Sequence, residues 1–236
     1  MKVFDELIQS GWIFPVKDHI ILADLKLCTA ENSFWEGFIS AHDKARLKAI
    51  RTERSYRRVL LRLALVRIIL GYYLDFPADK ICFKKNKYGK PGIINPVVNS
   101  NFNISHSGDD IIVIFDFDRE VGIDIENSSS FNKRNVYLLK GLYSGGELER
   151  YHALAKQDQF EFFCRTWVVK EAILKALGVG LTVKLSCLEL PELDNDKVIK
   201  FSLTICRKNM QIQFIRHADK YIGIAYCEER AGKCLI

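Results

Sequence analysis

The stretch NFNISHSGDDIIVIFDFDREVGIDIE, residues 101–126, decides the fold. Short apolar runs at residues 102–104, 111–115 and 121–125 predict three strands, because β-branched and aromatic residues favour extended chain. The acidic, turn-prone segment DFDRE, residues 116–120, separates the last two runs. We place a boundary between two halves of the chain near this turn.

Long helices are expected on both sides of these strands. Residues 43–74 predict one helix, with a single apolar face formed by Val59, Leu63, Val66 and Leu70. Residues 158–177 predict a second helix, which ends at the glycines 178 and 180. Strand-like segments follow at residues 200–206, 211–216 and 221–226. This order of elements predicts an α+β fold with antiparallel strands.

Composition excludes several classes of protein. The 236 residues are 48% hydrophobic and 27% charged, which is typical of a globular protein and not of a disordered or fibrous chain. No apolar run approaches the ~18 residues of a membrane span, and the acidic amino terminus does not resemble a signal peptide. Seven scattered cysteines without a CxxC pair favour the reducing cytoplasm. A net charge of +6 favours a phosphate-bearing ligand or an acidic partner.

GIDIE, residues 122–126, is the first pattern with candidate chemistry. Asp124 and Glu126 share one face of the expected strand, because side chains alternate along it. Paired carboxylates suit magnesium, which takes one or two of them and leaves positions for water and phosphate. Solvated acids on an edge strand are the alternative interpretation.

Two further patterns point to phosphate chemistry. In WVVKEAILKALGVG, residues 167–180, Glu171 and Lys175 lie four apart and share a helix face, as a surface ion pair also would. In NISHSG, residues 103–108, we expect His106 in a turn between two strands. There the imidazole and the backbone N–H groups of Ser105, Ser107 and Gly108 are available to a phosphate, unless the histidine is structural.

In this order, NISHSG, GIDIE and WxxKEAxxK resemble the motifs of the 4'-phosphopantetheinyl transferases of the longer, surfactin-synthetase-activating type. KYGKP, residues 87–91, resembles that family's loop before the histidine motif. The expected helix that contains Arg46 and ends in LALVR, residues 63–67, resembles its amino-terminal helix. The resemblance spans residues 44–181. It implies an α+β pseudo-dimer of two similar halves, 1–119 and 120–236, each a small antiparallel sheet packed with a long helix.

The resemblance also implies the reaction and the partners. Such an enzyme, a holo-[acyl-carrier-protein] synthase, moves the 4'-phosphopantetheine arm of coenzyme A to a serine of an apo acyl or peptidyl carrier protein. It releases adenosine 3',5'-bisphosphate and depends on magnesium, with manganese as the alternative. The carriers belong to fatty acid, polyketide or non-ribosomal peptide synthases. Coenzyme A binds between the halves, and we expect a monomer without nucleic-acid or membrane partners.

Roles for single residues follow from the same resemblance. Asp124, Glu126 and Glu171 match the acidic positions around the metal. Glu171 is the expected catalytic base, acting directly or through water, and Lys175 is the catalytic cation that stabilises the departing bisphosphate. The positions that match coenzyme A contacts are Arg46, Lys90, Ser105, His106 and Lys175.

Some features depart from the family pattern. Asp43 stands where some relatives have a lysine, which leaves the 3'-phosphate to Arg46 with Lys44 or Arg58. SGG before Glu147 replaces a bulkier stretch, so the choice of carrier stays open. The tail after Asp194 offers no site residues, and unrelated decoration is one interpretation of it.

Two other classes of function compete with the transferase. A magnesium-dependent nuclease or phosphohydrolase would use the same three carboxylates, but it gives no role to KYGKP or NISHSG. An RNA-binding module would rest on the basic helix stripe of Arg54, Arg58 and Arg62, which a solvated helix face explains as well. RNA binding also needs clustered aromatic residues, and the 15 Phe and 9 Tyr show no such pattern.

Overall fold

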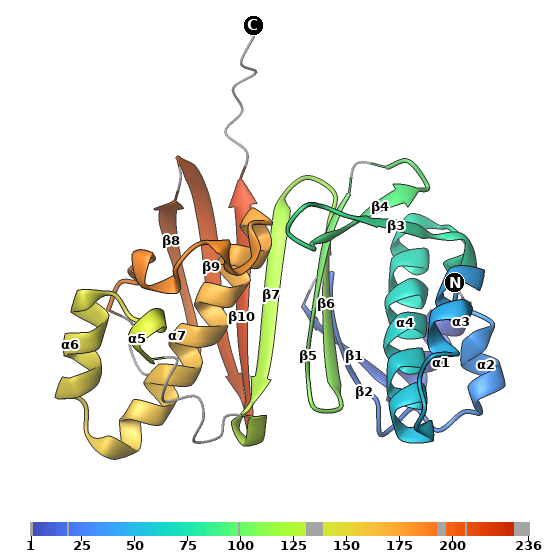
Figure 1. Cartoon of the computed structure of the whole chain (residues 1–236), viewed down its shortest axis with the longest axis horizontal. Coiled ribbons are helices and arrows are strands. Elements are labelled where there is room, and N and C mark those ends of the chain that lie inside the picture. The colour runs from blue at the N-terminus through green and yellow to red at the C-terminus, as the bar shows by residue number, and fades with distance from the viewer. Residues whose placement is uncertain are drawn as a thin grey trace, which may run out of the picture.

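The computed structural model describes residues 2–17, 19–98, 100–130, 139–192, 197–205 and 207–228. Two four-stranded antiparallel sheets lie side by side, and a 22-residue helix covers the outer side of each (Figure 1). The layers therefore run helix, sheet, sheet, helix. No helix within the described ranges is both long and apolar enough to span a membrane.

The first sheet and its helices come from the first half of the chain. The strands β1 (Ile13–Lys17), β2 (Ile20–Asp24), β5 (Asn101–Ser107) and β6 (Asp110–Asp116) pair in the order β1-β2-β6-β5. The helices of this half are α1 (Lys2–Gln9), α2 (Asn32–Glu36), α3 (Ala41–Leu47) and the long α4 (Glu53–Leu74). A separate hairpin is formed by β3 (Cys82–Lys85) and β4 (Pro91–Asn95).

The second half repeats this plan. The strands β7 (Glu120–Asn127), β8 (Val198–Ile205), β9 (Lys208–His217) and β10 (Lys220–Glu228) pair in the order β7-β10-β9-β8. Its helices are α5 (Leu139–Leu142), α6 (Gly145–Ala153) and the long α7 (Lys156–Leu177). In both halves the strand before the long helix pairs with the last strand of that half, as β2 with β6 and β7 with β10. The predicted α+β pseudo-dimer is thereby confirmed.

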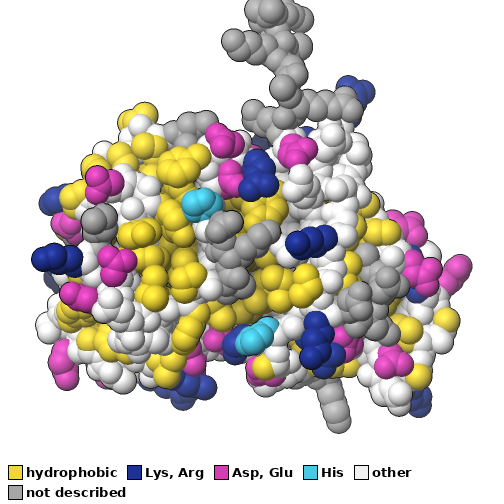
Figure 2. Space-filling model, turned by 180° about the vertical axis from the view of Figure 1, so that it is seen from behind, with side chains coloured by type: hydrophobic (Ala, Val, Ile, Leu, Met, Phe, Trp, Pro, Cys, Tyr) yellow, Lys and Arg dark blue, Asp and Glu magenta, His cyan; other side chains and the backbone are white. Residues whose placement is uncertain are grey.

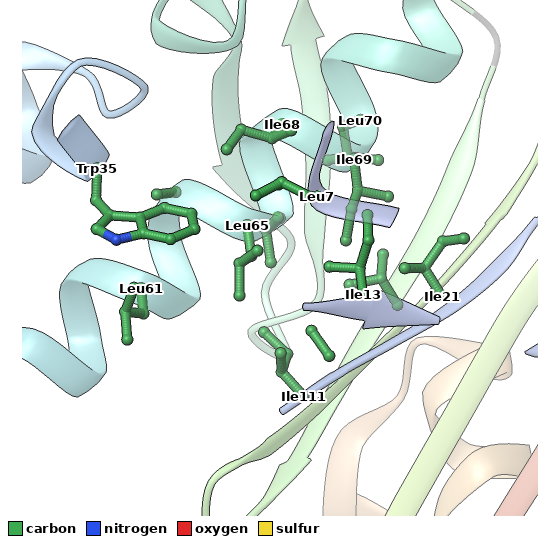
Figure 3. Packing of buried hydrophobic residues seen from close by; sticks show 14 of the residues in the cluster. Leu7, Ile13, Ile21, Trp35, Leu61, Leu65, Ile68, Ile69, Leu70 and Ile111 are labelled. Atoms are coloured by element: carbon green, nitrogen blue, oxygen red, sulfur yellow. The ribbon is translucent and has the colours of Figure 1, made fainter. Parts of the chain in front are cut away.

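Each half has its own apolar core. In the first, Leu65 and Ile69 of α4 point toward Ile13, Ile21 and Ile111 of the sheet (Figure 3). The core of the second lies between α7 and the β-sheet. A third cluster, rich in isoleucine, joins the two sheets and includes residues of β2, β6, β7 and β10. Because this seam is apolar, the two sheets are held together largely by the hydrophobic effect.

The surface is not uniformly polar. From behind, hydrophobic side chains gather over the middle of the molecule, and most charged side chains surround them (Figure 2). Such exposure is common in globular proteins, because polar groups are too few to cover the whole surface.

A buried ion pair ties a short helix to the long helix in each half. In the first, Asp43 of α3 accepts hydrogen bonds from Arg67 of α4, at 2.5 Å between Oδ2 and one terminal nitrogen. In the second, the ammonium of Lys170 lies 2.5 Å from Oε2 of Glu147, and both side chains are almost fully buried. Arg67 and Lys170 are each the fifteenth residue of their long helix (Glu53–Leu74, Lys156–Leu177). The repeat thus extends to single charged residues.

The structure corrects the expected helix over residues 43–74. The chain forms two helices, because the hydroxyl of Thr52 accepts from the N–H of Ser55 and starts a new helix there. Arg46 lies in α3 and not in the helix that contains LALVR.

The expected turn at His106 is also wrong. Strand β5 continues through His106, which pairs with Ile111, and the turn begins only at Gly108, where φ is +58°. The sequence suggested a turn because Ser105 and Ser107 are polar. In the structure their hydroxyl groups bond to carboxylates of the other half of the chain, so these polar residues lie within a strand.

The tail after Asp194 is not decoration. It supplies β8, β9 and β10, three of the four strands of the second sheet. Without these strands α7 would have only β7 to pack against in this sheet.

The close approach of α7 to its sheet depends on glycine. A Cβ at Gly122 of β7 would lie 2.0 Å from the carbonyl oxygen of Ala172, and one at Gly223 of β10 would lie 2.2 Å from that of Val168. Both contacts are with helix backbone, which cannot rotate away as a side chain can. Larger residues at these positions would therefore push the helix off the sheet.

We expect Gly122→Ala to lower the free energy of unfolding by about 1–3 kcal/mol, as overpacking of a core typically does. Urea denaturation would measure the loss. Gly141→Ala is the matched control, because among the described residues no atom outside its own helix backbone and chain neighbours lies within 4 Å of a Cβ at that position. Equal unfolding midpoints for the two variants would contradict the packing argument.

Candidate functional site

The candidate site lies where the edge strands β5 and β7 of the two sheets meet. Every second side chain of β5, from residue 103 to residue 107, forms a hydrogen bond with β7. Asn103 Oδ1 accepts from the N–H of Ile123 at 3.1 Å, and Ser105 Oγ lies 2.7 Å from Asp124 Oδ1. Ser107 Oγ lies 2.7 Å from Glu126 Oε2. The Ser-x-Ser of one half is therefore matched to the Asp-x-Glu of the other.

Lys175 of α7 completes the contact at Asp124. Its ammonium lies 2.6 Å from Asp124 Oδ1 and 3.0 Å from Ser105 Oγ. Asp124 is buried, whereas the side chain of Lys175 is 27% exposed. The lysine thus neutralises a buried carboxylate while part of it still faces solvent.

Glu171 lies one helical turn before Lys175. Its Oε1 is buried and makes no hydrogen bond within the part of the chain described. Burial raises the pKa of its carboxyl group, the nearby charge of Asp124 raises it further, and Lys175 opposes the shift. A carboxyl group in these surroundings holds a proton more readily than an exposed one, which suits a general acid or base.

The donor set fits a hard divalent cation. Asp124 Oδ2, like Glu171 Oε1, is buried and makes no hydrogen bond among the described residues. Two oxygen-only ligands with free lone pairs are the usual protein contribution to magnesium. Glu126, the third predicted ligand, is held by Ser107, and the described His, Cys, Asp and Glu side chains do not form a closed group of three ligands.

His106 lies on β5 between the two serines, so its side chain points to the other face of the strand. Partial burial lowers the pKa of its imidazole, and the positive charges of Arg62 and Lys175 act in the same direction. The positive charges of Arg62 and Lys175 that oppose protonation of His106 would attract an anion to this part of the surface.

Sequence reasoning missed the part played by Arg62 beside this site. Arg62 donates to the carbonyl of Gly108 at 2.9 Å, and Arg58 lies 2.7 Å from Asp109 at the same turn. The sequence showed Arg62 only as part of a basic stripe, whereas Arg58 was also a candidate contact of the 3'-phosphate. Their four-residue spacing indicated that they share one helix face. The sequence alone did not indicate that this face meets the turn at residues 108 and 109.

Within the described part of the chain, the predicted coenzyme A contacts Arg46 and Lys90 do not bond to Ser105, Asp124 or Lys175. The side chain of Arg46 is 61% exposed and lies 3.6 Å from Asp43. The ammonium of Lys90 lies 2.7 Å from Glu120 at the start of β7. The structure brings Ser105, Asp124 and Lys175 into direct contact, and the roles assigned to Arg46 and Lys90 stay predictions.

Comparisons with known proteins point to one family. The family model described as 4'-phosphopantetheinyl transferase superfamily matches residues 120–227, and the model described as 4'-phosphopantetheinyl transferase, N-terminal, matches residues 28–116. The chain is 31% identical over 170 residues to 4'-phosphopantetheinyl transferase Sfp of Bacillus subtilis (strain 168), which covers 72% of this chain and 74% of that protein.

A mammalian relative is matched over a smaller share. The chain is 29% identical over 160 residues to the L-aminoadipate-semialdehyde dehydrogenase-phosphopantetheinyl transferase of Homo sapiens. The match covers 64% of this chain and 52% of the human protein, so it spans about half of that relative.

The hydroxyl of Ser107 donates to Glu126 and accepts from the N–H of Asn127 at 3.0 Å. We expect Ser107→Ala to lower the free energy of unfolding by about 1–3 kcal/mol, because a half-buried carboxylate and an N–H lose a partner. Ser202→Ala, on the exposed side of β8, is the control and should change stability by less than about 0.5 kcal/mol. If both variants unfold like the parent protein, this bond does not hold the two halves in register.

Proposed function

The chain belongs to the 4'-phosphopantetheinyl transferase superfamily, and we propose on this premise that it moves the 4'-phosphopantetheine arm of coenzyme A to a serine of an apo acyl or peptidyl carrier protein. Adenosine 3',5'-bisphosphate is the other product. The observation that carries the proposal is the contact of Ser105, Asp124 and Lys175, with Glu171 one turn away. This cluster combines a cation with carboxylates, as transfer from a pyrophosphate requires.

Glu171 takes the proton in the proposed reaction. The carrier serine oxygen forms a bond to phosphorus while the pyrophosphate bond breaks, and the serine proton passes to Glu171 directly or through water. The raised pKa of Glu171 supports this role, since a carboxylate with a higher pKa is a stronger base.

Lys175 stabilises the charge on the departing bisphosphate. Its ammonium is held by Asp124 and Ser105 and is partly open to solvent, so it meets a phosphate with little reorganisation. Asp124 and Glu171 would hold magnesium through their unbonded oxygens, with Glu126 as third ligand and manganese as the alternative metal. When bound, the metal supplies positive charge to the phosphate oxygens.

The nucleotide end of coenzyme A is assigned to the first half. His106 and Ser105 would contact the phosphates, and Arg46 would contact the 3'-phosphate. Arg62 adds a further cation beside His106. The contacts of Lys90 favour a different role for that residue. We also place the division between the halves between residues 119 and 120, where the turn after β6 ends and β7 begins.

The partners would be carriers of fatty acid, polyketide or non-ribosomal peptide synthases. A net charge of +6 supports this proposal, because positive charge speeds encounter with an acidic partner. One chain supplies both edges of the site, so a monomer in the cytoplasm is sufficient for the reaction.

Intact mass spectrometry of an apo carrier tests the proposal. The protein is incubated with coenzyme A, magnesium and several carriers in parallel, and a second set receives EDTA. A gain of one phosphopantetheine arm that is lost with EDTA supports the transferase. Breakdown of coenzyme A in samples without any carrier would indicate a phosphohydrolase instead.

We expect Asp124→Asn to lower the transfer rate by about 10²-fold or more, because a neutral amide would hold both magnesium and the ammonium of Lys175 more weakly than the carboxylate does. Asp79→Asn is the control, since Asp79 is 40% exposed and its one ion pair among the described residues is with Lys80. Circular dichroism would show whether each variant is folded. A folded Asp124→Asn protein with the parent rate would exclude Asp124 from the site.

Lys175→Ala should slow turnover by about 10²-fold and leave KM for coenzyme A nearly unchanged. The reason is that this ammonium matters most when charge develops on the leaving group. Lys156→Ala, an exposed lysine at the start of α7, is the control. A rise in KM with an unchanged kcat would make Lys175 a binding residue only.

A further inference from the structure

Lys90 is surrounded by acceptors that belong to the second half of the chain. Its ammonium lies 2.7 Å from Glu120 Oε2, 3.1 Å from the carbonyl oxygen of Ala176 and 3.3 Å from that of Val121. Its side chain is only 14% exposed. An ammonium has three N–H donors, so these three acceptors use all of them. A phosphate would have to displace one of these contacts to reach the lysine.

One of these acceptors lies in the last turn of α7. Carbonyl groups there have no partner within the helix, and the helix dipole makes this end negative. The ammonium of Lys90 therefore meets the carbonyl of Ala176 with both a hydrogen bond and a favourable charge. Ala176 directly follows Lys175, the proposed catalytic cation.

Asn86 of the same hairpin bonds to a carbonyl group just beyond the end of the helix. Its Nδ2 donates to the carbonyl of Gly178 at 3.0 Å. Its Oδ1 accepts from the N–H groups of Tyr88 and Lys90, at 2.9 and 3.0 Å. A single side chain thus shapes the hairpin turn and attaches it to the end of the helix.

The fit between this hairpin and the helix end is close. Gly178 has φ of +66°, and a Cβ there would lie 3.3 Å from Cδ of Lys90. At Gly180, where φ is +59°, a Cβ would lie 3.4 Å from the carbonyl oxygen of Tyr88. The hairpin and the end of α7 are therefore so close that a side chain at either glycine would crowd the hairpin.

We propose that Lys90, with Asn86, is a positioning residue that caps the carboxyl end of α7 from the opposite half of the molecule. The cap fixes the last turn of the helix and so holds Lys175 against Asp124. Only the consequence for catalysis rests on the proposed function. In this role Lys90 acts through the helix and makes no contact with the nucleotide.

Hydrogen exchange and nucleotide binding distinguish the two roles of Lys90. We expect Lys90→Met to speed amide exchange at residues 174–178 about tenfold, because the loss of a cation and a hydrogen bond frees the last turn. Asn86→Ala should act in the same direction. Lys85→Met, an exposed lysine of the same hairpin, is the control and should leave this exchange unchanged.

Binding and turnover complete the test. In Lys90→Met we expect kcat to fall about tenfold, while the Kd of adenosine 3',5'-bisphosphate, measured by calorimetry, changes less than about threefold. Unchanged exchange at residues 174–178 in Lys90→Met would overturn the cap, and a tenfold weaker Kd with unchanged exchange would make Lys90 a nucleotide ligand. Because exchange needs no turnover, an inactive parent protein would refute the proposed function and leave this test valid.

Discussion

The close contact of α7 with β7 and β10 is the constraint on which the site depends. Gly122 and Gly223 let the helix backbone approach the strands to a distance that any Cβ would prevent. Asp124 lies two residues from Gly122 on the same face of β7 and pairs in register with Gly223. Because Gly122 and Gly223 have no side chains, α7 lies close enough to the sheet for Lys175 to reach Asp124. A wider spacing between helix and sheet would leave the lysine short of the carboxylate.

Neither half of the chain holds the site alone. The acids and the lysine come from the second half, whereas the hydroxyls of Ser105 and Ser107 that orient the acids come from the first. The isoleucine-rich seam brings the two strand edges together, and the β3–β4 hairpin reaches across to the end of α7. The interactions that join the two sheets on folding therefore also assemble the candidate site.

Local periodicity was enough to predict some of this arrangement. Strand alternation placed Asp124 and Glu126 on one face, and the four-residue spacing placed Glu171 near Lys175. The register between β5 and β7 could not be predicted. The two strands belong to different sheets and no hairpin turn joins them, so local sequence does not fix which residues face each other. The surroundings of Lys90 were hidden for a similar reason, since its partners Glu120 and Ala176 are distant in sequence. The break before Thr52 was missed because a capping hydroxyl outweighed a continuous helical pattern.

The matching ion pairs of the two halves give a common numbering for the long helices. Counted from Arg67 and Lys170, the place of Glu171 is taken in α4 by Ile68, and that of Lys175 by Tyr72. Ile68 lies in the core, and Tyr72 stacks on Phe4 of α1 with ring centroids 4.0 Å apart. One copy of the repeated scaffold therefore carries ionisable groups, while the other carries apolar groups that hold an extra helix. The two halves repeat one plan, but only the long helix of the second half contributes ionisable groups to the candidate site.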